Sequence, residues 1–339
     1  MRRHVTPGRL VGLGILLLAA AALVLWLTPS DRYILLPDRA RPVGPLVTVA
    51  KGHGSPAPHS GRIYFLAVVV RKASLLERLF PSLHEGATLV PGSALRTPGV
   101  SQQTQEKIDR RDMSQSQSIA GAVALRRLGY KVVTRESGAQ VSAVIAGMPA
   151  VGKLKPTDVI TAVDGKAIDS PAQLRAHMRS VLPGQTVRLT VRSASGLRSV
   201  SLKTAADPHA PSRAIVGVII TQAAQIRLPF KITIDPGNVV GPSAGLAFAL
   251  EIMEKLGRDV AHGNRVAATG ELELSGAVLP IGGVEQKAVE AKSSHVDVLL
   301  VPAGENAARA RRYAGNVPVI AVRSFRQALR ALAKLPRHR

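Results

Sequence analysis

The sequence of 339 residues contains no cysteine, which excludes disulfide bonds, thiolate zinc sites and thiol nucleophiles together. Aromatic residues make up only 3% of the chain, although 46% of it is hydrophobic. Any packed core must therefore be built mainly from aliphatic side chains. A chain of this length can form two compact domains.

Acidic residues are also scarce, since 22 Asp and Glu stand against 45 Lys and Arg, a formal net charge of +23. Such a charge attracts polyanions such as nucleic acid, anionic lipid or acidic cell wall. It is equally consistent with a basic, Arg-rich proteome. The basic residues are scattered, without the basic-aromatic clusters that single-strand binders use for stacking. We therefore do not expect nucleic acid as a partner.

One stretch lacks charged side chains altogether. Residues 10–27 form an uninterrupted apolar run, and about 18 such residues reach the lower end of a bilayer span. The alternative is a cleaved signal peptide, but the run is long for one and ends in Leu-Trp-Leu rather than in a small-x-small site. We predict a cytoplasmic tail over residues 1–9 and a transmembrane anchor in membrane lipid over residues 10–28. Positive charges on both sides of the run barely decide its orientation.

Residues 29–129 start with a stretch rich in Pro and Gly, which is typical of a stalk or loose edge. The β-branched run from Ile63 to Val70 favours a strand. Residues 119–128 favour a helix that ends at Gly129. We interpret residues 29–129 as a stalk followed by an N-terminal strand and helix region.

Short strands separated by turn signals follow from Val141 to Leu202. Val159, Thr161 and Val163 mark an alternating strand that is closed by Asp164-Gly165, a hairpin dipeptide. Together with the sequences GMPA at 147–150 and LKPTDVI at 154–160, this pattern resembles a PDZ domain of the bacterial protease type.

The resemblance implies a β-rich domain over residues 130–205 whose groove accepts an extended peptide by strand addition. Leu128, Gly129 and Tyr130 are candidates for the loop that binds the peptide carboxylate. The alternative is that Gly129 simply ends the preceding helix.

Residues 147–153, GMPAVGK, match the spacing of a phosphate-binding loop. The next residue is Leu154 rather than the Ser or Thr that would hold magnesium, and Pro156 interrupts the helix that such a loop should open. We therefore expect no nucleotide, metal or other cofactor.

A serine flanked by glycines opens a strongly apolar helix in the sequence GPSAG, residues 241–245. A substrate backbone can approach Ser243 there, and unpaired N–H groups at a helix N-terminus can hold an oxyanion. The alternative is that Ser243 only caps the helix.

A second motif contains TGE at 269–271 and LPIGG at 279–283, and leads into a helix with Lys287 on its apolar face. A surface lysine with an apolar stem is the alternative. Burial disfavours the charged amine. A fall of roughly three units from a pKa of about 10.4 would leave Lys287 neutral near pH 7 and able to deprotonate Ser243.

These two motifs closely resemble the proteolytic domain of the Lon protease family, here over residues 206–339. The resemblance implies that Ser243 is the nucleophile, Lys287 the general base and Thr269 a supporting residue. We also expect the backbone around Ser243, at the start of the helix, to stabilise the oxyanion; the residues concerned are Gly241, Pro242, Ala244 and Gly245. Val240 departs from the family pattern, because soluble Lon proteins often carry an acidic residue three positions before the serine.

The order of anchor, PDZ domain and Lon-like domain resembles the membrane-bound PDZ-Lon proteins of Gram-positive bacteria, without an ATPase module. It implies an ATP-independent serine endopeptidase at the cell membrane, with its catalytic domain outside and flexible or unfolded extracytoplasmic proteins as substrates. The same resemblance implies a homo-oligomer. The fold class that we predict is α/β (α+β): a transmembrane helix, a PDZ-like domain and a Lon-type domain.

Two other functions fit parts of the sequence. One is a membrane-tethered scaffold that binds peptides but is catalytically inactive. The other is an α/β-hydrolase, because the sequence around Ser243 also fits a nucleophile elbow. Asp259 with His262 could complete its triad, although only a short segment follows Ser243 and no apolar strand runs directly into Gly241.

Overall fold

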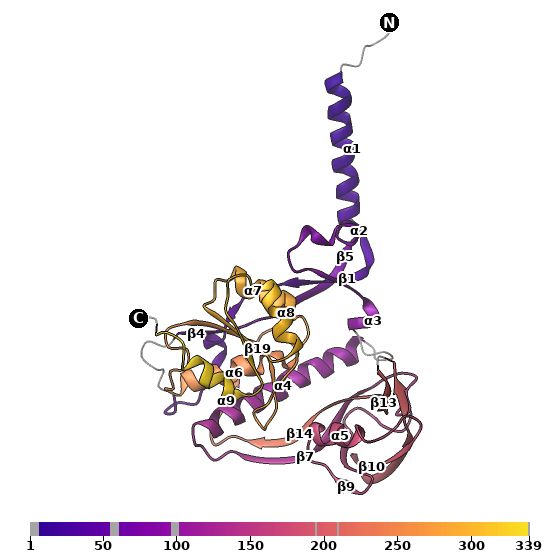
Figure 1. Cartoon of the computed structure of the whole chain (residues 1–339), viewed down its shortest axis with the longest axis vertical. Coiled ribbons are helices and arrows are strands. Elements are labelled where there is room, and N and C mark those ends of the chain that lie inside the picture. Colours follow the sequence, from indigo (N-terminus) through magenta and orange to yellow (C-terminus); the bar gives the residue numbers. More distant parts are fainter. Residues whose placement is uncertain (1–6, 55–60, 96–101, 194, 209, 338–339) are drawn as a thin grey trace.

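The computed structural model describes residues 7–54, 61–95, 102–193, 195–208 and 210–337, and Figure 1 shows its architecture. A helix at the N-terminus projects away from a body with two lobes. One lobe is β-rich and the other combines helices with a mostly parallel sheet. The mixed α/β class predicted from the sequence is confirmed.

The projecting helix is α1, Pro7–Leu27, and its apolar side chains are exposed. Within the described ranges, no helix meets the length and apolarity required of a membrane span. The transmembrane helix predicted over residues 10–28 is therefore not supported by the structure.

A three-stranded antiparallel sheet follows α1 and carries two short helices. Its strand order is β5-β1-β6. The elements of this region are β1 (Pro29–Pro37), β5 (Val68–Ser74), α2 (Leu75–Leu79), β6 (Thr88–Pro91) and α3 (Gly92–Leu95).

The β-rich lobe is built on a sheet with the strand order β11-β10-β8-β7-β14. Alternate residues of its strands point inward, as the two-residue period of a half-buried strand requires; Val187, Leu189 and Val191 are buried while their neighbours are more exposed. The elements are β7 (Val133–Val144), β8 (Val159–Val163), β9 (Lys166–Ala167), α5 (Pro171–Met178), β10 (Thr186–Ser193), β11 (Gly196–Lys203), β12 (Ala205–Asp207), β13 (Ala210–Ile215) and β14 (Val218–Arg227).

The second lobe has three layers around a sheet with the strand order β2-β4-β16-β19-β20. Its strands are β2 (Arg41–Pro42), β4 (Arg62–Phe65), β16 (Arg265–Ala268), β19 (Val298–Pro302) and β20 (Val319–Val322). Successive side chains of β19 point to opposite faces: Val298 and Leu300 pack towards α6 (Gly245–Lys255), whereas Leu299 and Val301 pack towards α7 (Val284–Ser293) and α8 (Glu305–Tyr313). Helix α9 (Phe325–Leu332) also packs on the α6 side.

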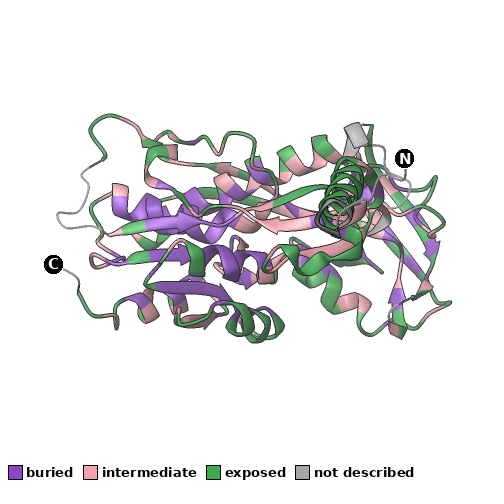
Figure 2. Ribbon diagram, turned by 90° about the horizontal axis from the view of Figure 1, so that it is seen from above, coloured by how far each residue is buried: buried purple, intermediate pink, exposed green. Residues whose placement is uncertain are grey.

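Helix α4 (Gln102–Arg127) packs against α6 and covers it on the side away from the sheet. Two small antiparallel ladders complete this lobe: β3 (Val47–Val49) with β15 (Ile232–Ile234), and β17 (Glu271–Leu272) with β18 (Val278–Leu279). Figure 2 shows that buried residues gather in these layers, whereas α1 is exposed. The core of this lobe therefore draws on residues well before the boundary predicted at residue 206.

Candidate active site

Ser243 lies in a tight turn directly before α6. The 3-10 turn Pro242–Ala244 runs into the helix, and Gly241 before it has a φ of 91°, a conformation that glycine adopts without steric cost. The hydroxyl of Ser116 on α4 donates to the carbonyl oxygen of Pro242 at 3.0 Å. Helices α4 and α6 thus hold the turn that carries Ser243 from two sides.

Lys287 lies on α7, which begins after Gly283. That glycine has a φ of 65°, and a Cβ added to it would lie 2.7 Å from a methyl group of Val68. Only glycine therefore fits where α7 meets the wall of the site. One turn later, the side chain of Lys287 is 3% exposed.

The structure brings Ser243, Lys287 and Thr269 together. The amine of Lys287 donates to Ser243 Oγ at 2.8 Å and to Thr269 Oγ1 at 3.1 Å. Thr269 Oγ1 donates in turn to the carbonyl oxygen of Ser243 at 3.2 Å, and the N–H of Gly270 donates to the same oxygen at 2.8 Å. The end of β16 therefore fixes both the backbone of the serine and the position of the amine.

Burial lowers the pKa of Lys287 to about 8, because it removes water that would stabilise the ammonium form. The charge of Glu290 acts in the opposite direction. About a tenth of the amine is then neutral at pH 7, far more than for an exposed lysine. A neutral amine in contact with a serine hydroxyl can act as its general base.

Glu290 was not identified from the sequence. It lies three residues after Lys287 on α7 and is completely buried. Its Oε1 accepts from the N–H of Ala67 at 3.5 Å, and its Oε2 has no hydrogen-bond partner in the described part of the chain. Burial raises its pKa to about 8. Its position on the apolar face of the helix was the available signal, since a glutamate there is as unusual as a lysine.

A cleft of about 480 Å³ opens beside the pair Ser243 and Lys287. Its walls are mostly aliphatic, with Asp38 and Arg41 as an ion pair of 2.7 Å at one side. Strand β5 lines it and pairs only with β1 in the described residues, so its other edge is open. Such an edge can receive an extended peptide.

The other residues that the sequence singled out lie elsewhere. Leu128, Gly129 and Tyr130 form the turn after α4, where the N–H of Tyr130 donates to Leu125 at 3.0 Å and its ring packs on Phe230. Strand β7 is paired on both edges, with β8 and β14. A role of this turn in carboxylate binding stays a prediction.

Asp259 and His262 contact each other at 3.4 Å, whereas the polar partner of Ser243 Oγ is Lys287. This arrangement does not favour the Ser-His-Asp alternative. The part of the chain that the structure describes contains no group of three potential metal ligands.

Comparison with known proteins identifies two domains. Residues 230–318 match the family model of the Lon protease (S16) C-terminal proteolytic domain, and residues 127–204 match that of a PDZ domain. The chain is 38% identical over 104 residues to Lon protease 2 of Bacillus subtilis, covering 31% of this chain and 18% of that protein. It is 47% identical over 62 residues to the Lon protease of Helicobacter pylori, covering 18% of this chain and 7% of that protein.

The matches thus span only a small part of the curated Lon proteases. Among solved structures, the PDZ domain of the SdrC-like protein from Listeria monocytogenes is 26% identical, with a TM-score of 0.24; the match covers 26% of this chain and 90% of that domain. By the two family models, the chain contains a PDZ domain and a Lon protease (S16) C-terminal proteolytic domain, and Ser243 and Lys287 are in contact inside the second match.

Proposed function

We propose that this protein hydrolyses peptide bonds with Ser243 as nucleophile and Lys287 as general base. The observation that supports the proposal best is the contact of 2.8 Å between a buried amine and the serine hydroxyl at the mouth of a cleft. Burial gives the amine a pKa of about 8, so it can accept a proton near neutral pH.

In this mechanism the neutral amine of Lys287 removes the proton of Ser243 as the seryl oxygen attacks the carbonyl carbon. The tetrahedral oxyanion forms at the N-terminus of α6, where backbone N–H groups and the helix dipole favour negative charge. Lys287 then gives the proton to the leaving amine. A water molecule hydrolyses the acyl-enzyme by the same route in reverse.

The cleft supports extended substrates. Its aliphatic wall and the open edge of β5 suit a segment without secondary structure of its own. The proposed chemistry consumes no nucleotide. We therefore propose that the substrates are peptides or proteins that are already unfolded or flexible, and that cleavage is independent of ATP.

Cleavage of an unstructured protein such as casein, together with labelling by a fluorophosphonate probe, tests the assignment. Ser243→Ala should abolish both, and Lys287→Met should reduce both to background. Lys292→Met is a matched control, because Lys292 lies on the same helix and forms a surface ion pair with Glu85 at 2.6 Å. Cleavage that persists in Ser243→Ala would contradict the proposal, and a folded wild type that neither labels nor cleaves would favour a peptide-binding scaffold.

We further propose that the protein is attached to a cell membrane through α1, with its two lobes outside. The exposed apolar side chains of α1 support attachment, because water is a poor solvent for them. Extraction of cell membranes with alkaline carbonate tests it: the full chain should stay with the lipid, and a chain without residues 1–28 should be released. Release of both by carbonate would contradict attachment.

A further inference from the structure

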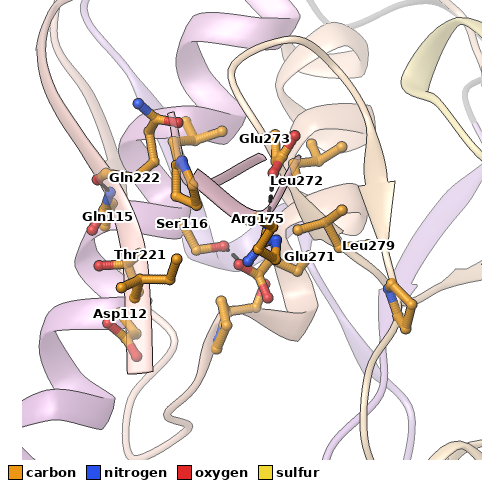
Figure 3. A pocket seen from close by; sticks show the side chains of 15 residues that line it. Asp112, Gln115, Ser116, Arg175, Thr221, Gln222, Glu271, Leu272, Glu273 and Leu279 are labelled. Carbon is orange, nitrogen blue, oxygen red and sulfur yellow. Dashed lines mark hydrogen bonds and ion pairs between the residues drawn. The ribbon is translucent and has the colours of Figure 1, made fainter. Parts of the chain in front are cut away.

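A second cleft lies on the far side of the nucleophile turn, between the two lobes (Figure 3). Its volume is about 360 Å³, within the range of about 300–1,000 Å³ that is usual for ligand sites. It is lined by α4, by the start of α5, by β14 and by the β17–β18 ladder. The side chain of Arg175 lies in its centre (Figure 3).

Strand β14 is an edge strand of its sheet and lines this cleft. It pairs along its length with β7, from Val218 with Val144 to Arg227 with Val133. Its other edge has no strand partner among the residues that the structure describes. Ile220, Thr221 and Gln222 of β14 line the cleft. The side chain of Gln115 on α4 already donates to the carbonyl oxygen of Gln222. The edge is therefore partly occupied at Gln222, and a further strand would pair with its remaining backbone groups.

The cleft favours a positive charge. Asp112, Glu271 and Glu273 line it, against the single cation Arg175, which lies 3.5 Å from Glu273. Asp112 Oδ1 is buried without a hydrogen-bond partner in the described residues. Burial raises the pKa of Asp112 to about 6 and that of Glu271 to about 7, and the charge of Asp112 contributes to the rise at Glu271. A cation placed between these two carboxyl groups would stabilise their ionised forms and so offset the cost of burying them.

The same cleft touches the back of the nucleophile turn. Pro242, which precedes Ser243, lines it and accepts a hydrogen bond from Ser116, another lining residue. Glu271 follows Gly270, whose N–H donates to the carbonyl oxygen of Ser243. A ligand in the cleft therefore contacts both segments that position the serine without entering the catalytic cleft.

We propose that this interlobe cleft binds an extended peptide segment along the edge strand β14, with a lysine or arginine side chain placed against Asp112 and Glu271. A peptide is favoured over a metal ion, because the described residues hold no group of three potential ligands, and because the site combines a strand edge with charge. Binding at this site changes the reactivity of Ser243. The effect on Ser243 rests on the proposed function, whereas binding of the peptide to the cleft does not.

Binding is measured by fluorescence anisotropy on the full chain carrying Ser243→Ala, so that cleavage cannot interfere. A peptide with one central arginine is compared with the same peptide carrying citrulline, which keeps the shape and removes the charge. We expect the arginine peptide to bind at least tenfold more tightly. Asp112→Asn and Glu271→Gln should each remove most of that difference. Glu85→Gln, which changes an exposed carboxylate, should leave it intact.

Two further measurements separate the parts of the proposal. N-methylation of alternate peptide amides should weaken binding, because it removes hydrogen bonds to a strand edge. The arginine peptide should change the rate at which a fluorophosphonate labels wild-type Ser243, and Glu271→Gln should suppress this change. Equal binding of the arginine and citrulline peptides, or equal binding by Glu271→Gln and its parent, would overturn the proposal even if Ser243 proves to be the nucleophile.

Discussion

In the proposed mechanism, the buried amine of Lys287 links stability to catalysis. Its side chain is almost fully buried, and its pKa falls to about 8 from an ordinary value of 10.5. Because one pKa unit corresponds to about 1.4 kcal/mol, the buried ammonium costs the folded state roughly 3 kcal/mol at pH 7. Between pH 8 and 10.5 the unfolded chain binds more protons at this residue than the folded chain does. Its contribution to stability therefore rises with pH across that window.

Lys287→Met should therefore abolish peptidase activity and stabilise the fold. An apolar side chain of similar length avoids the cost of the buried charge, and we expect the free energy of unfolding at pH 7 to rise by about 1–3 kcal/mol. Urea titration of the variant and wild type measures this. The exposed Lys292→Met should change stability by no more than about 0.5 kcal/mol. Loss of stability in Lys287→Met would show that the buried amine of Lys287 does not destabilise the folded state.

Thr269 should act as a positioning residue for the pair of Ser243 and Lys287. It is completely buried and contacts both, through the lysine amine at 3.1 Å and the serine carbonyl oxygen at 3.2 Å. Thr269→Val removes the hydroxyl while keeping the shape, and should lower kcat by up to about 10²-fold with little change in KM. Thr269→Ser keeps the hydroxyl and should restore most of kcat. A loss that appears only in KM would contradict this role.

At the scale of the element, α7 combines two groups of opposite chemistry on one face. Lys287 and Glu290 lie three residues apart, both buried, and each shifts the pKa of the other. Asp38 and Arg41 also act on Glu290, the first raising and the second lowering its pKa. Burial outweighs these charges, so that Glu290 is mainly protonated below pH 8 and Lys287 loses its proton near the same pH.

The rate of cleavage should therefore rise with pH and level off above about pH 8, since only the neutral amine is the base. As Glu290 ionises, its negative charge raises the pKa of Lys287. Glu290→Gln removes that charge, and the rising limb should move to lower pH by up to about one unit. Glu254→Gln is a matched control, since Glu254 is another buried glutamate that accepts backbone hydrogen bonds, from Val260 and Ala261. A shift to higher pH in Glu290→Gln would refute the coupling.

The sequence predicted the helix after Ser243 and the apolar face of Lys287, because both depend on local patterns and on short motifs. It did not predict that Ile63 to Val70 divides into two elements. Residues 62–65 form β4, parallel to β16, whereas β5 begins at Val68 in another sheet. Residues 63–65 and 68–70 are all apolar, β-branched or aromatic residues that favour strands, so their composition does not distinguish the two elements. The break at Leu66 and Ala67 depends on the cleft and on Glu290, which are tertiary features.

At the scale of the whole molecule, the PDZ domain is inserted into the proteolytic lobe rather than placed before it. The chain enters the PDZ domain after α4 and returns through β14 to β15. Tyr130 at the entry and Phe230 at the exit are in ring contact, with centroids 5.3 Å apart. The two ends of the insertion thus lie side by side. Residues on both sides of the insertion contribute to one hydrophobic core, with Ile63 and Phe65 packed in the same cluster as Phe248.

This arrangement predicts opposite results for two truncations. A chain in which a short Gly-Ser linker joins Tyr130 to Phe230 loses the PDZ domain but keeps β4, α4 and α6, and should unfold cooperatively and still label at Ser243. A fragment of residues 206–339 keeps Ser243 and Lys287 but loses β4, β3 and α4. This leaves one edge of β16 without its partner and α6 uncovered. It should show no cooperative thermal transition and no labelling. Calorimetry with fluorophosphonate labelling measures both. A folded, reactive fragment of 206–339 would show that the proteolytic lobe is contiguous in sequence, and hence that the N-terminal strands only decorate it.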